Sequence, residues 1–213
     1  MDYRKWCFAL IGMCLLFVRC SFSDLENETD KRQKESPQSF TNEALPENQV
    51  TVKTEVNVQF TNGFDFPVGK PDAQGYYNAQ EFTENNHLGD DWNGLGGGNT
   101  DLGDPIYSIA HGYVSFAENI GGGWGNVIRI VHTINENEQV ESLYAHCDAV
   151  HINEGDHVVK GQKIGTIGNN NGQYWAHLHL ELRSEIGLPI GGGYSSNTSG
   201  YLDPTDFIQQ NRR

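Results

Sequence analysis

Two histidines and a glutamate alternate with leucines in the stretch WAHLHLELR, which runs from Trp175 to Arg183. Side chains alternate across a β-strand, so His177, His179 and Glu181 share one face while the leucines share the other. Neighbouring imidazoles suit a shared metal ion, and Zn²⁺ takes imidazole and carboxylate ligands. The competing interpretation is a half-buried strand with an ordinary polar face, because a His-x-His pair also occurs by chance.

Two other stretches contain residues that could complete the three protein ligands of a catalytic zinc site. In NNHLGDDW, His87 precedes Asp91 by four residues, and in SLYAHCD, His146 follows Tyr144 by two. Strand alternation predicts that His146 shares a face with Tyr144 and Ser142. Each stretch alone is more typical of ordinary polar residues, but their combination in one β domain indicates a metal site.

Short strands must position these residues. Period-two patterning predicts strands within 51–60, 105–119, 126–134, 139–147, 157–168 and 175–183, separated by glycine and asparagine clusters. No segment between them has a sustained 3.6-residue apolar period. We therefore predict an all-β, mostly antiparallel fold of the sandwich or barrel-like type. Asp203 as an N-cap before Pro204 predicts a short C-terminal helical turn.

The N-terminal segment has the order of a secretory signal: basic Arg4 and Lys5, the apolar run 7–18, then small residues. That run is too short to span a bilayer. We predict a signal peptide over 1–23, or a lipoprotein signal that ends before a lipidated Cys20. Residues 24–50 are polar and charged, which predicts a flexible tether, and the domain is predicted over 51–209.

The composition restricts the partners. With 28 acidic and 14 basic residues, the formal net charge of −14 opposes the phosphate contacts that nucleic-acid binding requires. Export would leave Cys147 alone in the mature domain, which excludes a disulfide framework. Cys147 follows His146 directly, but strand neighbours face opposite sides, so a small buried thiol is the stronger interpretation than a Cys-His nucleophile.

The three motifs together resemble a known family. HLGDD (87–91), YAH (144–146) and HLH (177–179) are similar in order and separation to the His-x-x-x-Asp, Tyr-x-His and His-x-His motifs of lysostaphin and LytM-type zinc endopeptidases. The resemblance runs from about residue 64 to 207 and implies a β fold of the duplicated hybrid motif type.

The resemblance also implies roles for single residues. Zn²⁺ would be held by His87, Asp91 and His179, which leaves a fourth position for water or the substrate carbonyl. His146 and His177 would stay off the metal as catalytic residues that act on that water and on the developing oxyanion, as imidazoles near a metal-bound water can do.

Several neighbouring residues have two interpretations. Asp90 is predicted at the surface or hydrogen-bonded behind the ligands. Glu181 either orients a ligand or is solvent-facing or salt-bridged, and Tyr144 either lies near the cleft or is a packed strand aromatic. The remaining histidines match no ligand position and are predicted to be structural or at the surface: His111, His132, His151 and His157.

Two features depart from the family pattern. Bulky Tyr174 and Trp175 precede His177 where many relatives have small residues, which leaves substrate preference open. The loop WNGLGGGNTDLG after Asp91 is long, and either gates the site or is a passive insertion.

The residues together with the family resemblance predict an exported zinc metalloendopeptidase of the cell envelope that hydrolyses peptide bonds in peptidoglycan cross-links or stem peptides. The wall substrate follows from the resemblance alone. The first alternative is a non-catalytic module that regulates another cell-wall hydrolase, and the second is a hydrolase of non-wall proteins. We expect a monomer, no nucleic-acid partner, and membrane attachment only through Cys20.

Overall fold

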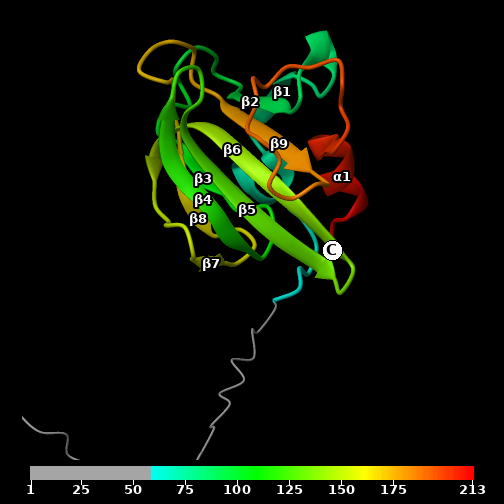
Figure 1. Cartoon of the computed structure of the whole chain (residues 1–213). Coiled ribbons are helices and arrows are strands. Elements are labelled where there is room, and N and C mark those ends of the chain that lie inside the picture. The colour runs from blue at the N-terminus through cyan, green and yellow to red at the C-terminus, as the bar shows by residue number, and fades with distance from the viewer. Residues whose placement is uncertain (1–58) are drawn as a thin grey trace, which may run out of the picture. The chain divides into compact units, whose positions relative to one another are not determined.

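The computed structural model describes residues 59–213 (Figure 1). The predicted signal over 1–23, the tether over 24–50 and most of the predicted strand 51–60 lie outside the described residues. Within 59–213, no helix has the length and apolar character needed to cross a membrane.

The described part consists of ten strands, two short helical turns and one α-helix. In chain order these are η1 (Gly69–Ala73), β1 (Tyr76–Gln80), η2 (Glu84–Asn86), β2 (Asp90–Gly94), β3 (Pro105–Tyr107), β4 (Gly112–Gly121), β5 (Gly125–Asn135), β6 (Glu138–Val150), β7 (His157–Val158), β8 (Lys163–Ile167), β9 (Leu178–Arg183), β10 (Tyr201–Leu202) and α1 (Pro204–Gln210).

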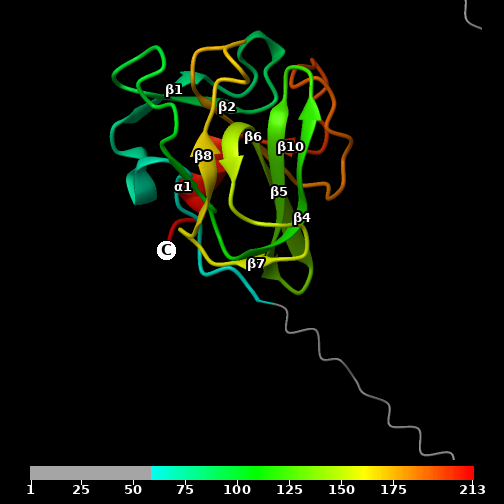
Figure 2. The same ribbon diagram turned by 90° about the vertical axis from the view of Figure 1, so that its left-hand side faces the viewer.

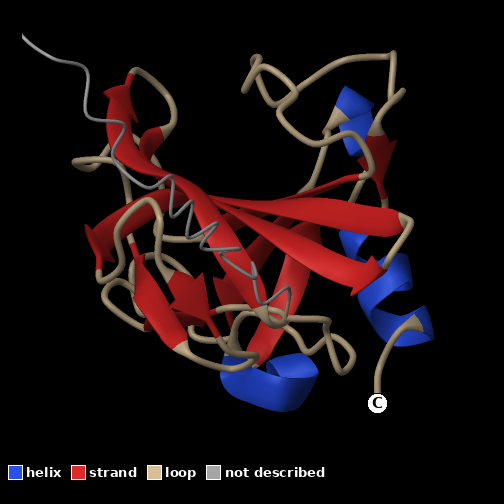
Figure 3. Cartoon of the chain, turned by 60° about the horizontal axis from the view of Figure 1, so that its bottom comes forward, coloured by secondary structure: helices blue, strands red, loops and turns tan. Residues whose placement is uncertain are grey.

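The strands form one antiparallel sheet in the order β1-β2-β9-β6-β5-β4-β7, with β10 beside β9 and β8 joining β3 to β6. The long strands β5 and β6 occupy its centre, between β3, β4, β7 and β8 on one side and β1, β2 and α1 on the other (Figure 1). Helical segments lie only at the margins of the described domain (Figure 3). The predicted all-β fold with a short C-terminal helix is confirmed.

The core forms on one face of β9, as its alternation predicts. Leu178, Leu180 and Leu182 are fully buried and pack with apolar side chains of β4, β5, β6 and β8. Burial of each such side chain contributes roughly 1.5–3 kcal/mol to folding. The opposite face of β9 therefore has to carry His179, Glu181 and Arg183.

Strand β6 changes its partner at His146. Residues Glu141–Ala145 pair with β9, whereas Cys147–Val150 belong to the ladder with β8. Between them His146 has a φ of 59°, in the left-handed region that non-glycine residues rarely adopt. The predicted face shared by His146, Tyr144 and Ser142 is wrong, because this irregularity breaks the alternation. Tyr144 and Ser142 are buried in the core, while His146 lies with the other histidines.

The helix α1 starts as predicted. The Asp203 side chain accepts a hydrogen bond from the amide of Asp206 at 2.9 Å, and Pro204 occupies the first helical position. One residue later, the Thr205 hydroxyl donates to Oδ2 of Asp90 at 2.6 Å, which ties the helix to β2.

Candidate metal and catalytic centre

The β2–β9 ladder brings the first two candidate ligands together. Asp91 is the register partner of His179, so both side chains project from the same face. His87 lies just before β2, where an isolated bridge to Tyr194 and a hydrogen bond from the amide of Leu88 to the carbonyl of Gly193 fix the backbone. Residues separated by about ninety positions in the sequence thus meet at one point.

The three candidate ligand atoms are close enough for one metal ion. Nε2 of His87 lies 2.9 Å from Nδ1 of His179, and Oδ1 of Asp91 lies 2.9 Å from that Nδ1 and 3.4 Å from Nε2 of His87. A tetrahedral site with bonds of about 2.0–2.1 Å has edges of about 3.3 Å. The donor set, two imidazoles and a carboxylate that converge within 4.8 Å, therefore fits Zn²⁺.

The local electrostatics favour a cation at this point. Burial alone would raise the pKa of Asp91, but hydrogen bonds from His179 and His87 hold it well below its usual range. Burial alone would lower the pKa of His179, yet its hydrogen bonds to Asp91 and Glu181 raise it to about 9. A metal ligand must be deprotonated, so zinc would replace the proton of His179.

His146 and His177 lie beside the cluster, and in each ring one nitrogen is hydrogen-bonded to a backbone carbonyl while the other is not. Nδ1 of His177 donates to the carbonyl of Trp175 at 2.8 Å, and Nδ1 of His146 donates to the carbonyl of Trp124 at 3.3 Å. Because carbonyls only accept, this assigns the proton to Nδ1 and leaves Nε2 as a proton acceptor in both rings. The ring centroids lie 4.7 Å apart.

Each of these two rings also contacts the cluster. Nε2 of His177 lies 3.9 Å from Oδ2 of Asp91, and the ring of His146 lies 5.8 Å from that of His179. Burial, together with the neighbouring His177 and His179, lowers the pKa of His146 to about 3, so this imidazole is neutral near pH 7.

A cavity of about 420 Å³ opens over the histidines, and three loops form its walls. Trp124 comes from the β4–β5 turn, Tyr174 from the β8–β9 loop, and Gly193 and Tyr194 from the β9–β10 loop. Figure 2 shows these loops gathered at the upper end of the domain. A Cβ atom on Gly193 would lie 3.3 Å from the Trp124 ring, and the φ of +75° is one that other residues rarely adopt, so both features favour glycine.

A second depression of about 590 Å³ continues from this cavity and shares Asp91, Tyr174 and His177 with it. Trp175 lines the depression and is 69% exposed. The long loop after β2 contributes Asn99, whose side-chain oxygen accepts from the amide of Ala176 at 2.9 Å. The loop is thus attached next to His177 and is part of the groove wall, which argues against a passive insertion.

The structure decides several open interpretations. Asp90 is not at the surface: it is buried and accepts hydrogen bonds from Thr205 and from the amide of Phe82. Tyr144 is a fully buried core residue, and burial raises its pKa to about 12. Glu181 is buried rather than solvent-facing, and it contacts both His179 and Arg183.

The remaining predictions of this kind concern histidines and a thiol. His132 is buried and hydrogen-bonded, His111 is half-buried, and His151 and His157 are exposed, as expected for structural or surface residues. Cys147 is a free, buried thiol whose pKa is raised to about 12 by burial, which confirms the predicted small buried thiol.

Sequence reasoning missed Trp124, Tyr194 and Arg183 as parts of the site. Trp124 packs edge-on against His179 with ring centroids 5.4 Å apart, and Tyr194 lies 5.1 Å from the ring of His87. Both stand in glycine-rich loops, GGGWGN and GGGYSS, and this pattern alone indicates only a turn.

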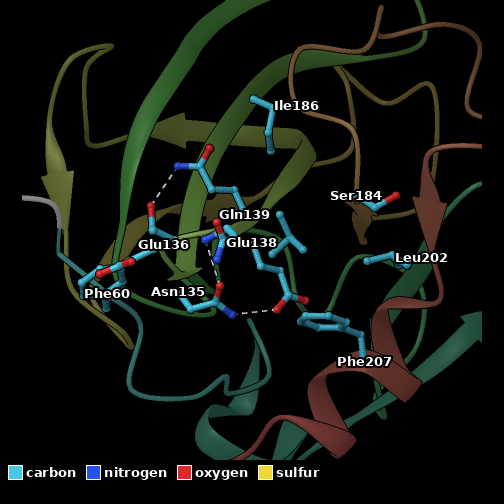
Figure 4. Close-up of a pocket in the computed structure, with 12 residues that line it drawn as sticks. Phe60, Asn135, Glu136, Glu138, Gln139, Ser184, Ile186, Leu202 and Phe207 are labelled. Atoms are coloured by element: carbon cyan, nitrogen blue, oxygen red, sulfur yellow. Dashed lines mark hydrogen bonds between the residues drawn. The ribbon is translucent and has the colours of Figure 1, made fainter.

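A larger depression of about 810 Å³ lies elsewhere, between the tip of the β5–β6 hairpin, β10 and α1 (Figure 4). Its lining includes Phe60, Ile186 and Phe207, and it contains no histidine or cysteine. The polar groups seen there bond to one another, as Asn135 does to Glu138 at 2.9 Å. The largest of the three depressions therefore lies away from the candidate metal cluster.

Comparison with known proteins identifies the family. Residues 92–192 match the model of peptidase family M23. The chain is 41% identical over 81 residues to lipoprotein NlpD of Yersinia enterocolitica. The matched segment covers 38% of this chain and 78% of that protein. The chain belongs to peptidase family M23. The resemblance to lysostaphin and LytM-type endopeptidases is thereby confirmed at the level of the family.

Two further similarities concern a longer relative and a solved structure. The chain is 40% identical over 81 residues to the murein hydrolase activator NlpD of Escherichia coli (strain K12), covering 38% of this chain but 20% of that protein. A chain in the crystal structure of the SpoIIIAH and SpoIIQ complex has a similar fold, with a TM-score of 0.52, 18% identity, and coverage of 68% and 100%. The M23 match includes His146, His177 and His179 but begins one residue after Asp91.

Proposed function

We propose that this M23 protein is an exported zinc metalloendopeptidase that hydrolyses peptide bonds in peptidoglycan cross-links or stem peptides, for cell-wall remodelling or lysis. The observation that carries the proposal is the convergence of His87, Asp91 and His179 within zinc-ligand distances, with His146 and His177 alongside. A structural role for five adjacent histidine and aspartate side chains would not require an open cavity above them.

The proposed chemistry divides between metal and protein. Zinc, when bound, lowers the pKa of water towards neutrality and polarises a carbonyl. His146 and His177 each present Nε2 as a proton acceptor, so one of them can take the proton of the attacking water. A protonated imidazole is then a cationic donor that stabilises negative charge on the former carbonyl oxygen.

The groove suits an extended peptide. The depression lined by Asn93, Asn99 and Trp175 joins the cavity at Asp91 and His177, so a chain lying along it would pass over the proposed metal position. Peptidoglycan as the substrate, and the cell envelope as the location, are supported by M23 membership and by relatives named as lipoproteins and murein hydrolase activators.

The test is to incubate the purified protein, with zinc, on purified peptidoglycan and to identify released peptides by mass spectrometry. We expect defined fragments that disappear with a chelator and in His177→Ala, but persist in His151→Ala, a matched exposed histidine outside the site. Release that is unchanged by chelation would reject the metalloendopeptidase.

A second candidate function is regulation of another cell-wall hydrolase, and the similarity to the murein hydrolase activator NlpD favours it. In that case the protein alone would release no peptidoglycan fragments, whether or not it binds zinc. Added to a purified murein hydrolase, it would increase the release of fragments by that enzyme. His177→Ala would leave such stimulation intact, whereas it would abolish peptidase activity.

A further inference from the structure

The proposed metal ligand His179 contacts a buried ion pair formed by Glu181 and Arg183. Glu181 and Arg183 both have 0% exposure, on the same face of β9 as His179. Oε1 of Glu181 lies 3.2 Å from Nε2 of His179. Its other oxygen, Oε2, accepts from Nε and Nη2 of Arg183 at 2.9 and 2.6 Å. The carboxylate is therefore fixed between a guanidinium and an imidazole.

Arg183 is held in turn by the loop that forms one wall of the cavity. Its guanidinium donates to the carbonyl of Leu188 at 3.1 Å and to that of Ile190 at 3.4 Å. Three residues beyond Ile190, Gly193 lies against Trp124 and within 4.0 Å of the His179 ring, measured from an added Cβ. The ion pair thus connects His179 with the loop that covers it.

Glu181 determines which nitrogen of His179 can bind a metal. Without metal, both carboxylates accept from the ring, Asp91 from Nδ1 and Glu181 from Nε2. If zinc replaces the proton on Nδ1, Glu181 holds the remaining proton on Nε2, and the lone pair of Nδ1 is free for the metal. That Nδ1 is the atom that faces His87 and Asp91. The opposite proton position would direct N–H at the metal.

We propose that Glu181 and Arg183 are positioning residues that hold His179 with Nδ1 directed to the metal, Glu181 directly and Arg183 by fixing the Glu181 carboxylate. This inference rests on the proposed zinc site. Such partners behind a metal-binding histidine commonly change metal affinity by 10–100-fold. Glu181→Gln cannot accept both hydrogen bonds, because its NH₂ group would face either Arg183 or His179.

The matched control is Glu141→Gln. Glu141 is also buried, on β6, and pairs with Arg129 at 2.6 Å, whereas its nearest approach to Arg183 is 3.6 Å and it does not contact His179. Both substitutions remove one buried negative charge from the same region. They differ in contact with the ligand histidine, so a merely structural effect would appear in both.

The experiment measures zinc affinity by competition with a chromophoric chelator, and the visible absorption bands of the Co²⁺-substituted protein as a report on ligand geometry. We expect Glu181→Gln to weaken zinc binding 10–100-fold and to alter the Co²⁺ bands, and Glu141→Gln to change the affinity less than threefold. Arg183→Lys, which keeps the charge but loses the paired hydrogen bonds, should lie between them. Equal losses in Glu181→Gln and Glu141→Gln would overturn the proposal.

A measurement on the unmodified protein covers the case in which Glu181→Gln fails to fold. Imidazole ¹⁵N NMR of the zinc-loaded protein should place the remaining proton of His179 on Nε2, and a proton on Nδ1 would refute the proposal. If the unmodified protein binds no zinc, the proposed function itself fails. If it binds zinc and Glu181→Gln binds equally well, only the positioning role fails.

Discussion

Oδ1 of Asp91 lies 2.9 Å from Nδ1 of His179, across a register pair of the β2–β9 ladder. The adjacent Asp90 points to the other side of the same strand, where it binds Thr205 and the amide of Phe82. Asp91 is therefore a proposed metal ligand, whereas Asp90 is a buried hydrogen-bond acceptor. The same substitution at the two positions can be compared directly.

Asp91→Asn should abolish stoichiometric zinc binding, because the amide is a weaker ligand and removes the negative charge at the cluster. Asp90→Asn should retain one zinc per chain but lower the free energy of unfolding by about 1–3 kcal/mol, since one buried hydrogen-bond partner is lost. Metal analysis and urea unfolding measure the two effects. Zinc loss in Asp90→Asn with Asp91→Asn still loaded would contradict the ligand assignment.

Substitutions at His146 should reveal the strain of its left-handed backbone. We expect His146→Gly to be more stable than His146→Ala by about 1 kcal/mol, because only glycine adopts a φ of 59° without steric cost. Urea unfolding of both variants measures the difference. At the neighbouring Ala145, inside the regular ladder, glycine should instead be destabilising by about 0.5–1 kcal/mol. If glycine were less stable than alanine at both positions, the backbone at His146 would not be strained.

Gly193 and Gly192 differ in the space around them, although they are adjacent in one loop. A Cβ on Gly193 would press on Trp124 in a positive-φ conformation, whereas a Cβ on Gly192 would meet nothing within 4 Å. We expect Gly193→Ala to lower the free energy of unfolding by about 1–2 kcal/mol and to displace Trp124, and Gly192→Ala to stay within about 0.5 kcal/mol. Thermal unfolding and Trp fluorescence test this pair.

The buried His132 should make stability depend on pH. Its nitrogens face the carbonyl of His111 and the hydroxyl of Ser142, and burial lowers its pKa to about 4. In the unfolded chain the pKa of this histidine is about 6.5, so the unfolded state binds more protons than the folded state between pH 4 and pH 6.5. The contribution of His132, at most about 3 kcal/mol, is present above pH 6.5 and is lost as the pH falls towards 4.

Urea unfolding between pH 7 and pH 4 should show this loss in the unmodified protein and a shallower slope in His132→Asn. The exposed His151→Asn is the matched control and should retain the full slope. If His132→Asn has the same dependence of unfolding free energy on pH as the unmodified protein, the dependence arises from other groups.

Strand alternation was sufficient to predict much of the fold and the grouping of His177 with His179. The alternation in WAHLHLELR predicts both the leucine core and the polar face, and the Asp203-Pro204 pair predicts the start of α1. These signals are local, because strand periodicity and helix capping depend on residues within a few positions of one another.

The rest depends on contacts that no local pattern contains. The sequence around Asp91 lacks apolar alternation, so β2 was not predicted, although its pairing with β9 places the carboxylate. The loops that carry Trp124 and Tyr194 pack on the histidines only in the folded domain. Alternation also failed at His146, where β6 exchanges β9 for β8.

That exchange of partners limits how the Tyr-x-His motif can be transferred to another scaffold. On a regular strand, residues two apart point the same way, so a grafted imidazole would enter the hydrophobic layer beside its tyrosine. Here the irregular backbone at His146 turns the ring to the open side while Tyr144 remains buried. A design that copied the two residues without the left-handed backbone at the histidine would bury the imidazole, and the cleft would lack one of its two open imidazole nitrogens.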